Sequence, residues 1–177
     1  VFGDWSSDVC SSDLAGAADH VLQRLREIEP DRVIVQPFAV AQTRVLRCEV
    51  AIPGRAAPLP LEPMRPNGII PPVTPPDGLR GPVVHVGAAT GEDFSRKSVR
   101  DAIVVAHYNT GDTWLRAFRL GAKAVIFVRS GDPLDSRHAH VVNCSANLPR
   151  FFYSGAAADI PEGAEVTLQS EIAWEGG

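Results

Sequence analysis

The chain has 177 residues, of which 45% are apolar, and its 21 acidic and 17 basic side chains give a formal net charge of −4. This is the composition of a globular protein, and so small a net charge gives no electrostatic reason to expect nucleic acid or an anionic membrane as a partner. No apolar run reaches the ~20 residues of a membrane span.

The first residues differ in character from the rest. Residues 4–14 read DWSSDVCSSDL and have neither a helical nor a strand period. They resemble the translated tail of a short-read sequencing adapter, so we interpret 1–14 as a non-native leader; the alternative is a natural Ser/Asp-rich disordered leader. Without the leader's three aspartates, 18 acidic residues face 17 basic ones, for a net charge of −1. Two cysteines then remain, Cys48 and Cys144, which permit one disulfide without requiring it.

A helix and two strands are predicted before the middle of the chain. Residues 17–29 place their apolar side chains on one helical face, and Pro30 ends the helix. Alternating apolar residues predict a strand at 32–40 and another at 44–52. The apolar stripe of the helix consists of Val21, Leu22, Leu25 and Ile28.

Proline dominates the next segment. Residues 53–82 hold ten of the 15 prolines, which excludes a helix or a central strand there. A polyproline ligand for a partner domain is one interpretation. An ordered surface connection is the better one, because interleaved apolar residues would pack on the domain. They are Leu59, Leu61, Met64, Ile69 and Ile70.

The middle of the chain predicts a parallel strand–helix–strand unit. Strands are expected at 82–87, 102–108 and 122–128, and the last two are apolar enough to be buried on both faces. Between them we expect a helix that Asp112 caps and Gly121 ends, with Trp114, Leu115 and Phe118 pointing inward. Strands at 148–154 and 164–175 close the domain.

The residues offer three candidate kinds of chemistry and support none of them well. His138, His140 and Cys144 form a weak zinc pattern that a solvated loop explains more simply. His107 is the best lone histidine, but no nucleophile motif accompanies it, and a structural role is the simpler interpretation. The glycine turns at 87–92 and 109–112 match neither phosphate-binding fingerprint.

Three stretches of sequence resemble one known family. They are RPNGIIPPVTPPDGLRGPVVHVG at 65–87, AIVVAHYNTGDTWLRAFRLGAKAVIFV at 102–128, and LPRFFYS at 148–154. They are similar to the protease-associated domain of bacterial di-zinc aminopeptidases. The chain departs from that pattern at Met64-Arg65 and at His107-Tyr108, which affects the expected ligand surface more than the fold.

The resemblance implies a fold and a division of the chain. The fold class is α/β (α+β): a swivelling β/β/α protease-associated-like domain, preceded by the helix and strand of a peptidase domain. The expected parts are the leader 1–14, the peptidase helix and strand 15–42, the accessory domain 43–163, and a closing strand 164–177. The resemblance also implies a secreted or periplasmic protein whose truncated chain has lost its catalytic part.

The implied function is non-catalytic. Such a domain shapes substrate access or binds peptide, while the parent enzyme's zinc is held by the missing peptidase domain, which is also the expected partner of this fragment. No cofactor and no catalytic residue are therefore expected here. Alternatives are a stand-alone module that binds peptide or glycan, and a small hydrolase using His107 or the His138/His140 pair.

Any ligand surface is expected where parallel strands end, at the 109–113 turn and the 129–140 loop. A loop with no partner is the simpler interpretation of these segments. The candidate substrate-binding residues are Asn109, Asp112, Arg129, Arg137 and His138. We further predict that Val21, Leu25 and Ile28 are exposed or mediate self-association, because their partner domain is absent.

Overall fold

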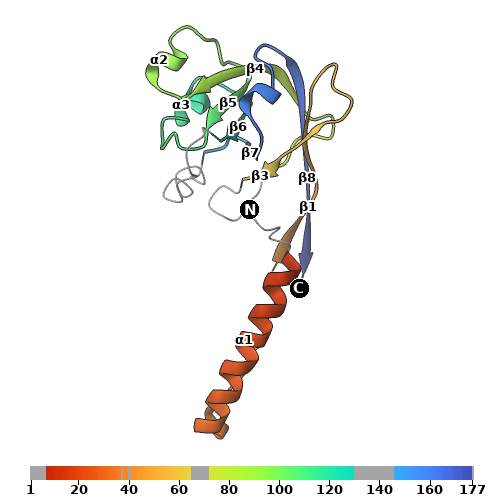
Figure 1. Cartoon of the computed structure of the whole chain (residues 1–177), viewed down its shortest axis with the longest axis vertical. Coiled ribbons are helices and arrows are strands. Elements are labelled where there is room, and N and C mark those ends of the chain that lie inside the picture. Colours follow the sequence, from red (N-terminus) through yellow and green to blue (C-terminus); the bar gives the residue numbers. More distant parts are fainter. Residues whose placement is uncertain (1–6, 37, 40, 65–71, 130–145, 177) are drawn as a thin grey trace. The chain divides into compact units, whose positions relative to one another are not determined.

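The computed structural model describes residues 7–36, 38–39, 41–64, 72–129 and 146–176 (Figure 1). The chain divides into two compact units, Val1–Val40 (unit 1) and Ala41–Gly177 (unit 2). Because unit 2 begins at the first residue of a strand and contains the final strand, the whole sheet belongs to it.

Unit 1 consists of the helix α1 (Ser7–Ile28) and a short 3-10 turn, η1 (Pro30–Arg32). The predicted helix is confirmed, but it begins ten residues earlier than its apolar period indicates, so 7–14 are helical although they lack that period. The predicted strand at 32–40 is wrong: residues 33–36 and 38–39 have no regular structure. A β-prone run forms a strand only where a neighbouring strand accepts its hydrogen bonds, and within unit 1 none is described.

Three residues of the apolar stripe of α1 are exposed, as predicted, and the fourth, Leu22, is half-buried. Val21 is 56% exposed, Leu25 48% and Ile28 76%. Leu25 and Ile28 also line a shallow hollow of about 390 Å³, together with Val33 and Ile34 of the following segment. No helix within the described ranges is long and apolar enough to cross a membrane.

Unit 2 is built on a single eight-stranded sheet with the order β2-β1-β8-β4-β5-β6-β7-β3. Its four central strands, β4 to β7, are mutually parallel, as the strand–helix–strand pattern predicts. The strands are β1 (Ala41–Ala51), β2 (Leu59–Pro60), β3 (Glu62–Pro63), β4 (Leu79–Gly87), β5 (Ile103–His107), β6 (Ala124–Val128), β7 (Arg150–Tyr153) and β8 (Glu165–Gly176).

The sheet is nearly closed on itself by the start of the proline-rich segment. β2 pairs with β1 at one edge of the sheet and β3 pairs with β7 at the other, yet only Leu61 separates β2 from β3. The Leu61 amide donates to the Cys48 carbonyl at 2.9 Å, which ties the crossing point to β1. Pro60 and Pro63 lie in the two edge strands, where a residue without a backbone N–H group is tolerated.

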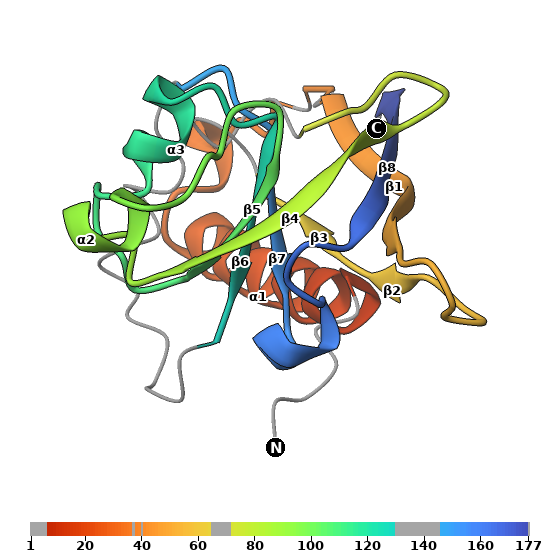
Figure 2. The ribbon, with the colours of Figure 1, turned by 90° about the horizontal axis from the view of Figure 1, so that it is seen from above.

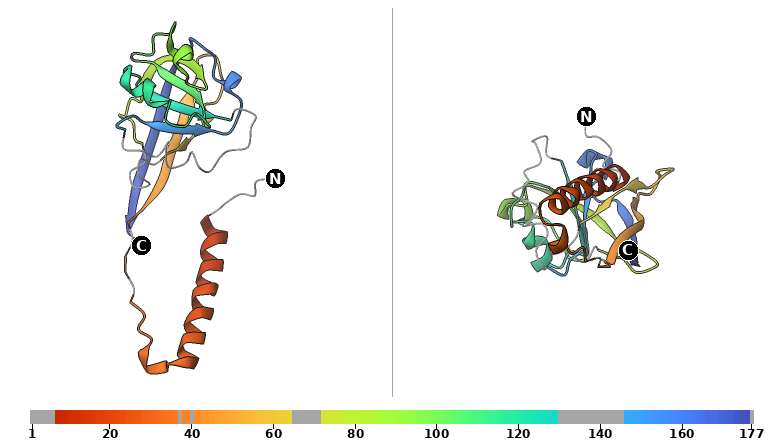
Figure 3. Two further views of the ribbon diagram at one scale, coloured as in Figure 1. Left: turned by 90° about the vertical axis from the view of Figure 1, so that its left-hand side faces the viewer. Right: turned by 90° about the horizontal axis from the view of Figure 1, so that it is seen from below.

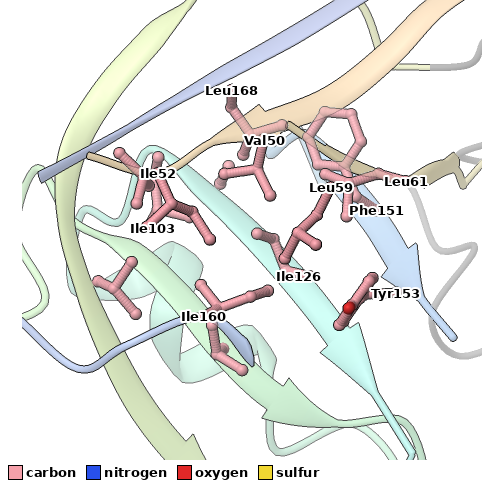
Figure 4. Close-up of a cluster of buried hydrophobic side chains, with 14 of the residues drawn as sticks. Val50, Ile52, Leu59, Leu61, Ile103, Ile126, Phe151, Tyr153, Ile160 and Leu168 are labelled. Carbon is pink, nitrogen blue, oxygen red and sulfur yellow. The ribbon is translucent and has the colours of Figure 1, made fainter. Parts of the chain in front are cut away.

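The strands bury two hydrophobic clusters, one on each face. Inside the curved sheet, Ile103, Ile126 and Phe151 pack with residues of β1, β2 and β8 (Figure 4). On the opposite face, the alternate residues of the same strands, such as Val104 and Phe127, form the second cluster. β5 and β6 are thus buried on both faces, as their continuous apolar runs predict.

Two short helices contribute to the second cluster, α2 (Gly91–Phe94) and α3 (Leu115–Arg119), and they lie beside β4 and β5 (Figure 2). Trp114 is fully buried and Leu115 half-buried, but Phe118 is 43% exposed, so the predicted inward stripe is only partly right. Asp112 is not the helix cap. Trp114 occupies the cap position. The Asp112 carbonyl accepts a hydrogen bond from the Leu115 amide within the turn that precedes the helix.

The described parts of the proline-rich segment form the predicted surface connection. Leu59 and Leu61 are buried in the first cluster, and Met64 packs on the second. Ile69 and Ile70 lie outside the described residues. Further along, Thr74 exchanges backbone and side-chain hydrogen bonds with Ser170 of β8. The apolar side chains that interrupt the prolines therefore anchor the connection.

Strands β1 and β8 form the longest pairing in unit 2. They are antiparallel from Ala51↔Thr167 to Ala41↔Gly176, with an irregularity between Val45 and Arg47. β4 pairs only with the first residues of β8. Beyond them, β1 and β8 continue side by side as a two-stranded ribbon that extends away from the rest of unit 2 (Figure 3). The predicted alternation of buried and exposed side chains along β8 is confirmed as far as Ser170, which is buried. It fails on the ribbon, where Trp174 is exposed.

Candidate functional site

The carboxyl ends of the parallel strands carry the first candidate site. β5 and β6 pair up to His107↔Val128, and the Tyr108 amide donates to the Val128 carbonyl at 2.9 Å. The turn after β5 is joined to the turn after β4, because the Thr113 hydroxyl lies 2.6 Å from the Thr110 carbonyl and 3.2 Å from that of Ala88. Two adjacent turns therefore form a connected rim.

Three of the five predicted substrate-binding residues lie at this edge. Asn109 is half-buried and Asp112 exposed in the turn after β5, and exposed Arg129 directly follows β6. Arg137 and His138 lie outside the described residues. The structure therefore brings Asn109, Asp112 and Arg129 to the same end of the sheet, as the parallel order predicts. That these residues bind substrate stays a prediction.

His107 ends β5 in a half-buried position beside the turn after β4. A Cβ added to Gly87 would lie 3.9 Å from the His107 ring, an ordinary contact distance, so the ring is a neighbour of this turn. Within the described residues, the charged neighbour of His107 is Asp93, and no hydrogen bond joins the ring to a serine, threonine or cysteine. Nothing in this arrangement activates a nucleophile.

Asp93 belongs to a capping box at the start of α2. The Thr90 amide and hydroxyl each donate to the Asp93 carboxylate at 2.8 Å, and the Asp93 amide donates back to the Thr90 hydroxyl at 3.4 Å. The backbone hydrogen bond from Thr90 is the largest cause that lowers the pKa of Asp93, followed by the hydroxyl. The carboxylate thus has a structural role at the rim.

No group of three or more His, Cys, Asp or Glu side chains could hold a metal ion within the described part of the chain. His138, His140 and Cys144 lie outside it, so the weak zinc pattern stays a prediction. Cys48 carries a free thiol whose pKa burial raises to about 11, against a lowering by its hydrogen bond with Ser170. A thiol so rarely ionised is a poor metal ligand and nucleophile.

Sequence reasoning did not identify a hollow on the β1–β8 surface. It has a volume of about 310 Å³ and is lined by side chains of both strands and by the Thr74–Pro76 segment. Ser170 holds this segment in place, because its hydroxyl donates to the Pro72 carbonyl at 2.7 Å. The lining residues are Arg47, Thr74, Pro75, Pro76, Gln169, Ser170 and Glu171.

A buried arginine was also missed. Arg150 is fully buried at the start of β7, and its guanidinium lies over the ring of Trp114, 5.0 Å from the centroid. Trp114 in turn packs edge-to-face on Phe127. The available signal was an arginine directly before an apolar strand, in LPRFFYS. That pattern does not distinguish a buried arginine from one at an exposed strand end.

Comparisons with known proteins show which solved structures have a similar fold. No protein-family model matches the sequence, and no curated protein matches it either. Among solved structures, the zinc aminopeptidase BSAP of Bacillus subtilis is similar with a TM-score of 0.57 at 15% identity, over 92% of this chain and 39% of that one. The aminopeptidase of Aneurinibacillus sp. strain AM-1 has a TM-score of 0.54 at 16% identity, over 92% and 40%.

A third solved structure agrees with these two. The peptidase M28 precursor of Shewanella amazonensis is similar with a TM-score of 0.50 at 18% identity, over 92% of this chain and 42% of that one. The chain therefore spans about two fifths of the length of the solved structures it matches. At such low identity the likeness concerns the fold alone, and the chain shares its mixed α/β fold with parts of two aminopeptidases, one of them a zinc aminopeptidase, and of an M28 peptidase.

Proposed function

We propose that unit 2 is a protease-associated-like accessory domain of a zinc-dependent, aminopeptidase-like exopeptidase. In this role it has no catalytic residue of its own, and it shapes the access of peptide substrates or binds them. The catalytic zinc belongs to a separate peptidase domain, which is the partner of unit 2. The fold shared with parts of zinc aminopeptidases supports this assignment.

The observation that carries the proposal is the pairing of Ala41 with Gly176. The two points at which the backbone enters and leaves unit 2 are neighbours on a two-stranded ribbon. Such a domain fits into a surface loop of a host domain without separating the residues that flank the insertion. The ribbon is also a narrow connection about which the domain could swivel.

Unit 1 supplies a second argument for a host domain. The exposed stripe of α1 and the exposed residues Ile34, Val35 and Phe38 after it leave an apolar surface uncovered. Covering each such side chain contributes about 1.5–3 kcal/mol. We propose that a peptidase domain covers them.

The alternative of a stand-alone module is favoured by one feature, the hollow on the β1–β8 surface. Its volume of about 310 Å³ is at the lower limit of small-molecule sites and suits one or two residues of a peptide or a sugar. A small hydrolase has less support, because the described surroundings of His107 contain no activated nucleophile.

A chimeric enzyme tests the accessory role. The region of the Bacillus subtilis zinc aminopeptidase that superposes on unit 2 is replaced by residues 41–176, and a second variant carries a short glycine linker there. We expect the chimera to fold, bind zinc and cleave peptides, with a kcat/KM for longer peptides that differs from that of the linker variant. Equal kcat/KM values for the two, with both folded, would refute the accessory role.

The isolated chain tests the hydrolase alternative. We expect no release of amino acids from peptide substrates and no stoichiometric zinc after purification. Zinc at one equivalent per chain, lost when His138 and His140 are replaced by alanine, would instead establish a metal site in the fragment.

A further inference from the structure

Exposed basic residues gather around the amino-terminal edge of the parallel strands, on the α3 side of unit 2. We call them the basic face. Arg80 lies at the start of β4, Arg100 precedes β5, and Lys123 precedes β6. Arg119 is the last residue of α3, whose carboxyl end leads back to this edge.

Specific contacts show that the basic face is continuous. The Asp101 amide donates to the Gly121 carbonyl at 2.9 Å, and the Lys123 amide donates to the Ala102 carbonyl at 2.8 Å. The Lys123 ammonium donates to the Arg80 carbonyl at 2.8 Å. Arg100 lies against Gly121, where its Cγ and Nη1 are 3.8 Å from the position of a Cβ. Arg80, Arg100 and Lys123 thus line one connected surface, to which the end of α3 leads through Gly121.

The basic face also lacks internal neutralisation. The ion pairs of the described residues use other cations: Arg24, Arg32, Arg44, Arg47 and Lys97. None of the four residues of the basic face, Arg80, Arg100, Arg119 and Lys123, joins an ion pair within the described ranges. Their charge therefore remains available to an anionic partner.

Exposed apolar side chains flank Arg119 in the sequence, and a hollow adjoins Arg80 and Lys123. Phe118 and Leu120 of the α3 region are 43% and 45% exposed, next to Arg119. A hollow of about 460 Å³ opens between Arg80, Lys123 and the Asp77–Leu79 turn. A surface that combines unpaired cations, exposed apolar side chains and a concave element has the character of a protein docking site.

We propose that the basic face docks an acidic segment of a polypeptide. Carboxylates of the segment pair with Arg100, Arg119 and Lys123, and its apolar side chains cover Phe118 and Leu120. A polypeptide fits better than a nucleic acid, because Asp77 in the hollow and Asp101 beside Arg100 would repel a regular row of phosphates. The proposal does not depend on the accessory role of unit 2.

The test uses the whole chain and a short fluorescein-labelled peptide in which glutamates alternate with leucines. Fluorescence anisotropy is expected to report saturable binding that weakens by about tenfold or more when salt rises from about 50 mM to about 500 mM. Replacing Arg100 and Lys123 together by glutamate is expected to weaken binding by about tenfold. If that variant fails to fold, Arg80→Glu with Arg119→Glu takes its place.

The matched control is Arg55→Glu, because Arg55 is exposed in the turn between β1 and β2. It should change the affinity by less than about twofold. Phe118→Ser should weaken binding of the glutamate–leucine peptide but not of a glutamate–glycine peptide. Absence of saturable binding, equal loss with Arg55→Glu, or tighter binding of a single-stranded oligonucleotide of the same charge would each overturn the proposal.

Discussion

The guanidinium carbon of Arg150 lies 5.0 Å from the centroid of the Trp114 ring, and both side chains are fully buried. The ring also packs on Phe127, with the two centroids 5.8 Å apart and the planes nearly perpendicular. Trp114 therefore links a buried cation of β7 to the centre of β6. Such a cation–π contact contributes more in a desolvated interior than at a surface.

Removal of the Trp114 ring should strongly destabilise unit 2. Trp114→Ala creates a large cavity and deprives Arg150 of its aromatic partner, so we expect the free energy of unfolding to fall by about 3–5 kcal/mol. Urea denaturation followed by circular dichroism measures this change. Phe118→Ala on the exposed side of α3 is the control and should cost less than about 1 kcal/mol. Equal losses would mean that Trp114 is not a core residue.

A substitution at Gly81 tests how closely two backbone segments approach each other at the edge of the parallel strands. A Cβ at this position would lie 2.5 Å from the carbonyl oxygen of Asp101, which is a backbone atom and cannot rotate away. We expect Gly81→Ala to lower the free energy of unfolding by about 1–3 kcal/mol. Gly16→Ala is the comparison, because it meets no atom within 4 Å and lies in α1. A neutral Gly81→Ala would contradict the packing of this edge.

Most of unit 2 was predictable from the pattern of apolar residues. The runs around Val104 and Val125 required strands buried on both faces, and these strands form the centre of the sheet. The strand predicted around Val35 failed, because a local pattern cannot tell whether a pairing strand exists. The closure of the sheet at Leu61 could not be predicted either, because it depends on contacts between segments that are far apart in the sequence.

The candidate site was less predictable than the fold. Parallel strand order alone brings Asn109 and Arg129 to one edge, which made that part accessible to sequence reasoning. Asp112 was misplaced as a helix cap, because α3 begins later and Trp114 takes the cap position. The buried position of Arg150 and the cluster of Arg100 with Lys123 depend on long-range packing and could not be read from spacing.

The capping box of α2 should make stability depend on pH in the acid range. Hydrogen bonds from Thr90 lower the pKa of Asp93 in the folded chain. A carboxyl group with a lowered folded pKa contributes stability above its unfolded pKa of about 3.9, and this contribution is lost as the pH falls through the folded value. The difference in unfolding free energy between wild type and Asp93→Ala should therefore shrink as the pH drops below about 4.

Thr90→Ala provides the control for this effect. The variant keeps the backbone donor, which is the larger cause of the lowered pKa, and removes only the hydroxyl. The pH dependence of its unfolding free energy in the acid range should therefore be reduced but still present. Urea titrations at several pH values measure this dependence. A pH-independent difference for Asp93→Ala would show that the carboxylate is not stabilised by the cap.

The Cys48 thiol should react slowly in the folded chain. Burial raises its pKa from 9.0 to about 11, so at pH 8 the reactive thiolate is about a hundredfold rarer than in an unperturbed cysteine. With Cys10 and Cys144 replaced by serine, alkylation by iodoacetamide should be correspondingly slower in the native protein than in urea. The same measurement on Glu49→Gln should show a modest acceleration, because the Glu49 charge adds to the raised pKa. Equal native and unfolded rates would contradict the packing of Cys48 against β8, since burial is the largest cause that raises the pKa of the thiol.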